Sequence, residues 1–154
     1  MKTLLYGLLG LAVLLVAAVL LGPRFIDWTA YKETVSARLG EVTGREVTIA
    51  GRVNVEVLPR PTLTLNGLRV ANAPGGRADH LLRADELRLT LGWAPLLRAN
   101  LALEAVELAA PRVVLESNGE HGPNWRGLSA DALPADLAVD ALTVADGRIV
   151  YRDL

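Results

Sequence analysis

The side chains that could carry out catalysis are few and stand apart in this sequence. The two histidines, His80 and His121, lie beside Asp79 and Glu120, and neither has a second nitrogen or thiolate ligand at a metal-binding spacing. The chain has no cysteine, which excludes disulfides, thiolate metal sites and cysteine nucleophiles. We therefore interpret both histidines as surface residues and predict no metal site and no cofactor.

Nucleophile and phosphate-loop motifs are missing as well. Ser36, Ser117 and Ser129 lie outside any G-x-S-x-G elbow, and Gly75-Gly76 fits neither a P-loop nor a dinucleotide fingerprint. The carboxylates are scattered over polar positions, where exposure to solvent is a sufficient explanation. A net charge of −1 without any run of Lys and Arg disfavours nucleic-acid binding. No active site is indicated.

The first element of the chain is strongly apolar. Residues 4–21 contain no charge or strong polar group, and Lys2 and Gly22-Pro23 flank them. A helix of this length rises about 27 Å, close to the roughly 30 Å of bilayer hydrocarbon. The run predicts a transmembrane helix that anchors the chain, with residues 1–23 as a separate membrane segment.

A cleaved signal peptide is the alternative for this segment. Lys2 supplies a positive n-region and Val16-Ala17-Ala18 passes as a cleavage site, but cleavage after Ala18 would cut inside the apolar run. An uncleaved anchor is therefore favoured. The positive-inside rule alone does not settle its orientation, because positive charges lie on both sides of the run: Lys2 before it, and Arg24, Lys32 and Arg38 after it.

Residues 24–154 suffice for one domain with a modest core. An amphipathic helix is predicted at its start, with Asp27 as N-cap and Gly44 just past the end. We predict that its apolar stripe covers one end of a sheet, and the alternative places its aromatic residues at the membrane interface. The stripe has spacings of three and four residues and consists of Trp28, Tyr31, Val35, Leu39 and Val42.

From Glu46 onward apolar and polar residues alternate with a period of two, as half-buried strands require. About eight such runs with short connections predict an α+β, mainly β domain, in which an antiparallel meander forms a curved open sheet. Turn signals separate the runs, and the last of them is a strong hairpin signal. They are Ala50-Gly51, Pro59-Arg60-Pro61, Ala73-Pro74-Gly75-Gly76, Asn118-Gly119 and Asp146-Gly147.

One face of this predicted sheet is aliphatic and needs a cover. A core filled by side chains is one interpretation, and on pattern alone it is favoured. The other is a trough for lipid acyl chains, in which each sheltered methylene gains about 0.8 kcal/mol. The candidate face consists of Val53, Val55, Val57, Leu63, Leu65, Leu87, Leu89, Leu91, Leu101 and Leu103.

Ordered blocks along essentially the whole chain resemble the AsmA family. The first blocks are Phe25-Ile26-Asp27-Trp28, Tyr31-Lys32, Thr43-Gly44-Arg45 to Ile49, and Val57-Leu58-Pro59-Arg60-Pro61. The later blocks are Leu68-Arg69-Val70-Ala71-Asn72-Ala73-Pro74, Trp93-Ala94-Pro95-Leu96-Leu97-Arg98, Val106-Glu107-Leu108 to Pro111, Gly122-Pro123-Asn124-Trp125, Leu142-Thr143-Val144 and Asp146-Gly147-Arg148-Ile149-Val150-Tyr151. Single blocks are weak signals, whereas their order is fairly specific.

The resemblance implies a single-pass inner-membrane protein of double-membraned bacteria, with residues 24–154 in the periplasm. It implies a non-enzymatic relative of chorein-type bridge-like lipid transfer proteins, whose helix-capped β-groove conducts phospholipids toward the outer membrane and serves outer-membrane assembly. The aliphatic face would then bind lipid, and Trp28 and Tyr31 would lie at the membrane interface. Expected partners are phospholipids, the inner membrane, and outer-membrane or envelope proteins, but no nucleic acid.

A membrane-tethered scaffold that acts through protein contacts is the alternative function. Family members usually continue well beyond this length, so we expect residues 24–154 to be an N-terminal fragment of a longer protein. Eight strands at about 4.8 Å would make a groove of roughly 38 Å, shorter than a bilayer of about 40–45 Å. This piece alone is therefore not expected to bridge two membranes.

Overall fold

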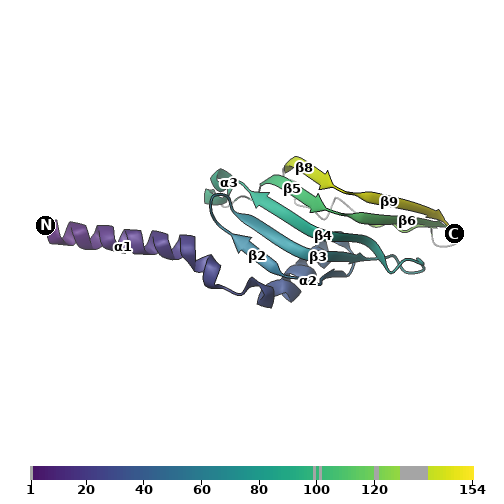
Figure 1. Cartoon of the computed structure of the whole chain (residues 1–154), viewed down its shortest axis with the longest axis horizontal. Coiled ribbons are helices and arrows are strands. Elements are labelled where there is room, and N and C mark those ends of the chain that lie inside the picture. The colour runs from purple at the N-terminus through teal and green to yellow at the C-terminus, as the bar shows by residue number, and fades with distance from the viewer. Residues whose placement is uncertain (1, 99, 101, 120–121, 129–138) are drawn as a thin grey trace.

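The fold is mainly β, with one open sheet that follows the helical N-terminal part of the chain (Figure 1). The computed structural model describes residues 2–98, 100, 102–119, 122–128 and 139–154. Helix α1 (Lys2–Leu21) extends away from the sheet, and many of its apolar side chains are exposed. Among the described residues, no helix combines the length and the apolar character that crossing a membrane requires.

The predicted amphipathic helix is built in two parts. A 3₁₀ turn, η1 (Gly22–Phe25), leads to a second one, η2 (Trp28–Tyr31), and then to α2 (Lys32–Thr43). The Asp27 carboxylate accepts a hydrogen bond from the Thr29 backbone N–H at 3.1 Å, and α2 ends at Gly44, where φ is +64°. Both predicted end residues are therefore confirmed, although regular α-helix begins only at Lys32.

The core lies between α2 and the adjoining part of the sheet. Trp28, Val35 and Leu39 pack against it from the helical side, which confirms that the apolar stripe covers one end of the sheet. Leu65 is fully buried at its centre. The buried cluster consists of Val47, Ile49, Val53, Leu65, Leu68, Val70, Ala84 and Leu87.

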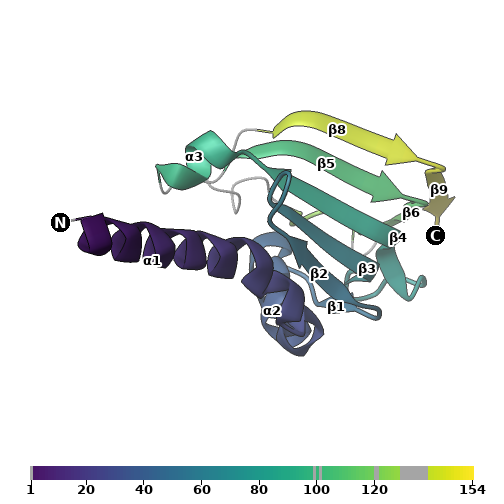
Figure 2. The same ribbon diagram turned by 60° about the vertical axis from the view of Figure 1, so that its left-hand side comes forward.

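Nine strands occupy five positions across the sheet. β3 and β4 each fill one position, whereas the pairs β1 and β2, β5 and β6, and β8 and β9 each share one as consecutive segments; β7 adds a short pairing to β6. Figure 2 shows this order, from β1 and β2 beside α2 to β8 at the opposite border. The bounds are β1 (Val47–Ile49), β2 (Val53–Glu56), β3 (Thr62–Ala71), β4 (His80–Leu91), β5 (Leu103–Ala109), β6 (Arg112–Asn118), β7 (Gly122–Pro123), β8 (Val139–Ala145) and β9 (Arg148–Asp153).

The predicted meander is correct for the first four positions and wrong for the last. β1 to β6 pair antiparallel, but β8 runs parallel to β5 and β9 runs parallel to β6. Asp146-Gly147 is therefore not a hairpin turn, because β8 and β9 continue one after the other along the same neighbours. Asp146 adopts φ of +56°, so the turn signal reports a local backbone bend.

The interruptions of the three split positions line up across the sheet with Gly67 on β3 and Asp85 on β4, and we call this line the crease. It passes through Ala50-Gly51, Gly67, Asp85, Ala110-Pro111 and Asp146-Gly147, as the register on both sides shows. The backbone bends at Gly51, Ala110 and Asp146. Gly67 has φ of +68°, and an added Cβ would lie 3.2 Å from the Ala50 Cβ, so a glycine suits this point.

The crease also corrects the expected size of the sheet. Five positions at about 4.8 Å span roughly 24 Å, against the roughly 38 Å that eight separate strands would give. Ala50-Gly51 was predicted to separate two neighbouring strands, but β1 and β2 both pair with β3 along one border. The sheet thus has fewer positions side by side than the turn signals indicated.

Replacing Leu65 with alanine tests the position of the core. Because this side chain is fully buried, Leu65→Ala should lower the free energy of unfolding by about 2–5 kcal/mol. Leu142→Ala is the control, since Leu142 is 65% exposed and should cost less than about 1 kcal/mol. Urea unfolding of the full chain in a non-ionic detergent, followed by tryptophan fluorescence, measures both. Equal losses would contradict the core assignment.

Candidate functional site

Six of the ten candidate aliphatic residues stand in two cross-strand lines on one face of the sheet. Val53, Leu65 and Leu87 stand opposite one another on β2, β3 and β4, and Leu87 faces Leu108 on β5. A second line joins Val55, Leu63, Leu89 and Val106 in the same way. Since directly paired residues of adjacent strands point to the same side, these lines define one apolar face.

This apolar face is covered at one end only. Val53, Leu65 and Leu87 are buried in the core beneath η2 and α2. Leu101 lies outside the described residues, so the structure does not place it. The other candidates are half-buried: Val55, Val57, Leu63, Leu89, Leu91 and Leu103.

The same face continues onto the last strands, where its side chains are exposed. Val106 pairs with Leu142 and Leu108 with Val144, and beyond the crease Val113 pairs with Ile149. Among the described residues no strand pairs with the outer edge of β8 or β9. We call the following set the exposed apolar row: Val139 (46% exposed), Leu142 (65%), Val144 (52%), Ile149 (72%) and Tyr151 (61%). None of these five residues belongs to the aliphatic face that the sequence predicts.

The predicted membrane-interface pair has a mixed environment. Trp28 packs against the core and donates a hydrogen bond from its indole Nε1 to the Pro23 carbonyl at 2.8 Å. Tyr31 is 53% exposed, and the two ring centroids lie 5.9 Å apart. Trp28 therefore helps to fix the first turn of the folded domain. The membrane-interface role of Trp28 and Tyr31 stays a prediction.

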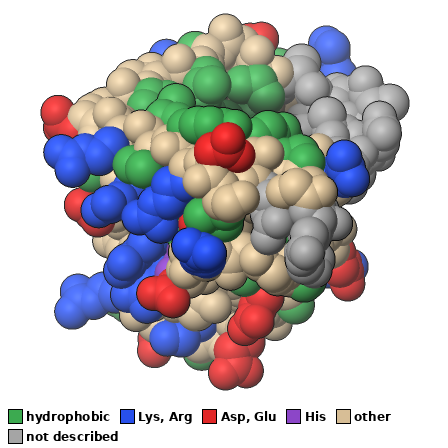
Figure 3. All heavy atoms as spheres, turned by 90° about the vertical axis from the view of Figure 1, so that its right-hand side faces the viewer, with side chains coloured by type: hydrophobic (Ala, Val, Ile, Leu, Met, Phe, Trp, Pro, Cys, Tyr) green, Lys and Arg blue, Asp and Glu red, His purple; other side chains and the backbone are tan. Residues whose placement is uncertain are grey.

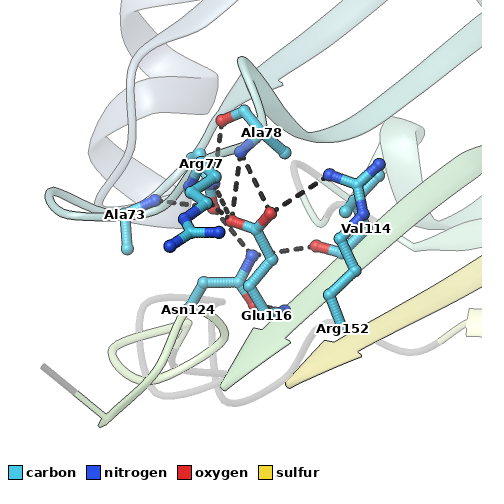
Figure 4. A network of polar contacts seen from close by, with 8 residues as sticks. Ala73, Arg77, Ala78, Val114, Glu116, Asn124 and Arg152 are labelled. Atoms are coloured by element: carbon cyan, nitrogen blue, oxygen red, sulfur yellow. Dashed lines mark hydrogen bonds and ion pairs between the residues drawn. The ribbon is translucent and has the colours of Figure 1, made fainter. Parts of the chain in front are cut away.

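A buried carboxylate organises the end of the sheet farthest from α1. Glu116 on β6 is 1% exposed, and its oxygens accept hydrogen bonds from the Arg77 N–H (2.8 Å), the Ala78 N–H (3.0 Å) and the Asn72 amide (2.8 Å). Arg152 Nη1 on β9 lies 3.4 Å away (Figure 4). The β3–β4 loop is thus folded around Glu116. A Cβ on Gly76 would lie 2.9 Å from Glu116 Oε2, so the loop needs glycine there.

Asn124 extends this network on the other side. Its amide oxygen accepts a hydrogen bond from the Glu116 backbone N–H at 2.8 Å, and its amide nitrogen donates to the Val114 carbonyl (2.8 Å) and to Asn72 Oδ1 (2.7 Å). Asn124 is 3% exposed. The pairing of β6 with β4 ends at Val113, opposite Leu82. The Asn124 side chain therefore bonds the β6 backbone just after the point where β4 no longer does.

The hydrogen bonds keep the Glu116 carboxylate charged. Burial alone raises the pKa of this group, but the hydrogen bonds from Ala78, Asn72, Arg77 and Arg152 together lower the pKa below its ordinary value of 4.5. The earlier interpretation of all carboxylates as solvated surface groups is wrong for Glu116. The available signal was Val114, an apolar residue on the polar face of β6, two positions before it.

Several family-like blocks meet in these contacts. Arg45 Nη2 donates to the carbonyl oxygens of Asn124 (2.9 Å) and Arg126 (2.8 Å), which joins the end of α2 to the segment after β7. Trp93 Nε1, at the start of α3 (Trp93–Leu97), donates to the Pro59 carbonyl at 3.0 Å. The blocks are thus tertiary docking points, which sequence spacing did not reveal.

The described residues contain no group of three or more His, Asp or Glu side chains placed to hold a metal ion. His80 lines a polar hollow beside Arg83, whereas His121 and Ser129 lie outside the described residues. The geometry supplies an apolar surface and a fixed hydrogen-bond network. We find no nucleophile held against a base within the described parts of the chain.

Comparison with known proteins identifies the family of this chain. The model of the AsmA family matches residues 1–153. The chain belongs to the AsmA family. No curated protein and no solved structure matches it. The match to the family model confirms the family resemblance that the sequence blocks indicated. The AsmA family is associated with lipid transport or envelope assembly.

The Glu116 network predicts a pH-dependent stability of this AsmA-family chain. A lowered pKa in the folded state stabilises the fold at neutral pH, and this contribution is lost as the pH falls below 4.5 through the folded pKa. Glu116→Gln should lower the free energy of unfolding by about 3 kcal/mol at pH 7, because an amide nitrogen would face backbone donors. The difference from the parent chain should shrink at pH 3.

Glu41→Gln is the matched control, since Glu41 forms an exposed ion pair with Arg38 at 3.0 Å. It should change the free energy of unfolding by about 0.5 kcal/mol or less at either pH. Denaturant unfolding at pH 7 and pH 3 measures all three proteins. A Glu116→Gln loss that is the same at both pH values would contradict the charged state of this carboxylate.

Proposed function

We propose that this chain is a membrane-anchored module of a non-enzymatic lipid transfer protein, which shelters phospholipid acyl chains on its apolar face. The lipid would move between the inner and the outer membrane in the service of outer-membrane assembly. The observation that carries the proposal is the exposed apolar row, which continues the buried apolar face onto the open border of the sheet.

The surface chemistry favours acyl chains over polar ligands. Leu142 and Val144 are more than half exposed although they lie on the same face as the core. Exposed aliphatic area costs about 25 cal/mol per Å², so a hydrocarbon chain laid along it is stabilised without any directed polar contact. A contiguous exposed apolar patch of this kind marks an interaction site in soluble domains.

The proposal includes an anchor formed by α1. Residues 4–21 carry no charge, and the apolar side chains described on α1 are mostly exposed, Leu8 and Leu14 at 66% each. Surrounding lipid would remove these apolar side chains from water and so stabilise the helix in the membrane. With α1 in the inner membrane, the sheet would stand in the periplasm, where Tyr31 and Trp28 begin the folded part. This part of the proposal rests on the apolar run and its exposure.

Photo-crosslinking tests the apolar surface. A photoreactive residue at Leu142 or Ile149 should capture phospholipid in cells, because both side chains lie on the exposed part of the apolar face. The same probe at Thr143, which points to the opposite face, should capture little. Mass spectrometry of the purified adducts identifies the species. Protein adducts without lipid at Leu142 and Ile149 would favour the tethered scaffold instead.

Reporter fusions test the anchor and its orientation. A reporter that is active only outside the cytoplasm should work when fused after Leu154, and a cytoplasm-only reporter should not. The N-terminus of the purified chain should retain residues 4–21, since the anchor is uncleaved. Activity of the cytoplasmic reporter would reject the orientation, and a chain that begins near Val19 would reject the anchor.

A further inference from the structure

The polar face of the sheet carries a line of arginines that crosses four strands. Arg69 on β3 pairs directly with Arg83 on β4, Arg83 pairs with Arg112 on β6, and Arg112 pairs with Arg148 on β9. We call these four residues the arginine row. They lie far apart in the sequence, and only the register of the sheet brings them together. The four side chains alternate with residues of the apolar face, so they point to the opposite side.

Like charges directly opposite one another destabilise a sheet. The arginine row contains three such pairs in succession, and none of its members forms an ion pair with a carboxylate of the described residues. The chain as a whole has a net charge of −1, so this concentration of positive charge is local. Folding therefore holds these guanidinium groups together against their mutual repulsion.

The same face on the other side of the crease gives a direct comparison. There Asn54, Thr64, Arg88 and Glu107 stand in one cross-strand line. Arg88 binds Glu86 at 2.8 Å and Glu107 at 3.4 Å, so its charge is compensated. The two lines belong to the same sheet and the same face, but only the arginine row lacks carboxylate partners.

A hollow lies at the centre of the arginine row. Its volume is about 250 Å³, and Arg83 and Arg112 line it together with groups from the β3–β4 loop and from β9. Figure 3 shows this end of the molecule, where Lys and Arg side chains gather beside a histidine. The remaining lining residues are Arg77, Ala78, Asp79, His80, Val114 and Arg152.

We propose that this hollow and the arginine row bind phosphate groups. Guanidinium groups reach the hollow from two strands of the row, from the loop and from β9, and a tetrahedral phosphate accepts hydrogen bonds from several such directions. A carboxylate is planar and is satisfied by one guanidinium fork. The row extends over roughly 14 Å, so further phosphate groups fit along it. The phosphate can belong to a lipid headgroup or be free in solution.

The site lies on the face opposite to the exposed apolar row, so its test does not depend on acyl-chain binding. The full chain in a non-ionic detergent is titrated with inorganic phosphate, dihexanoyl phosphatidic acid and dihexanoyl phosphatidylcholine, and calorimetry gives each affinity. Arg112→Gln should weaken binding of the phosphate ligand about tenfold. It should also raise the melting temperature of the ligand-free chain at low salt, because it relieves repulsion.

Arg88→Gln is the matched control, since it removes one positive charge from the same face. It should leave the affinity unchanged within about twofold and lower the melting temperature slightly, because it breaks two ion pairs. Arg83→Gln should also weaken phosphate binding and raise the melting temperature of the ligand-free chain. Agreement between the two variants shows that the effect does not depend on one position.

The arms of the titration distinguish the two sources of phosphate. Arginine-dependent binding of phosphatidic acid but not of inorganic phosphate assigns a lipid headgroup, and equal affinities assign the phosphate group alone. Two results overturn the proposal. One is binding that does not change in Arg112→Gln and Arg83→Gln. The other is equally tight, arginine-dependent binding of poly-glutamate, which would point to an acidic protein partner.

Discussion

Burial of one sheet face beneath a single short helix is the constraint on which the rest of this structure depends. A helix of the length of α2, twelve residues, spans about 18 Å, and it contacts mainly β1 at the border of the sheet. Val35 and Leu39 therefore complete the core only around Leu65. The same apolar face continues past the reach of the helix, and its side chains become progressively more exposed toward β8 and β9. The apolar face is exposed at β8 and β9 because α2 is too short to cover it there.

The crease divides the sheet into two parts with different polar surfaces. On the side of the crease that holds β2, β5 and β8, Arg88 is neutralised by glutamates of its own and the neighbouring strand. Beyond the crease, the arginine row has no such partners among the described residues, and the hydrogen-bond network of Glu116 lies beside it. The backbone bends at Ala110 and Asp146 keep both parts in one continuous ladder. One sheet thereby carries two electrostatically distinct regions on the same face.

The sequence allowed the local features of this fold to be predicted. Period-two alternation located the strands, Asp27 and Gly44 bounded the helical segment, and the order of the blocks indicated the family. The parallel placement of β8 and β9 was not predicted, because Asp146-Gly147 carries the same local signal in a bend as in a hairpin turn. Glu116 and the arginine row were missed for a related reason. Register decides which distant residues meet, and no local pattern encodes register between β4, β6 and β9.

The Glu116 network and the arginine row are physically linked. A buried carboxylate is costly unless its lone pairs are satisfied, and here backbone and side-chain donors satisfy them. Two of these donors belong to Arg77 and Arg152, whose side chains line the hollow beside Arg83. The carboxylate thus fixes the loop and the strand that surround the hollow, and its negative charge lies beneath a cluster of positive ones. The buried charge therefore offsets part of the repulsion among the arginines, while its oxygens, already occupied by hydrogen bonds from other groups, pair with neither Arg83 nor Arg112 among the described residues.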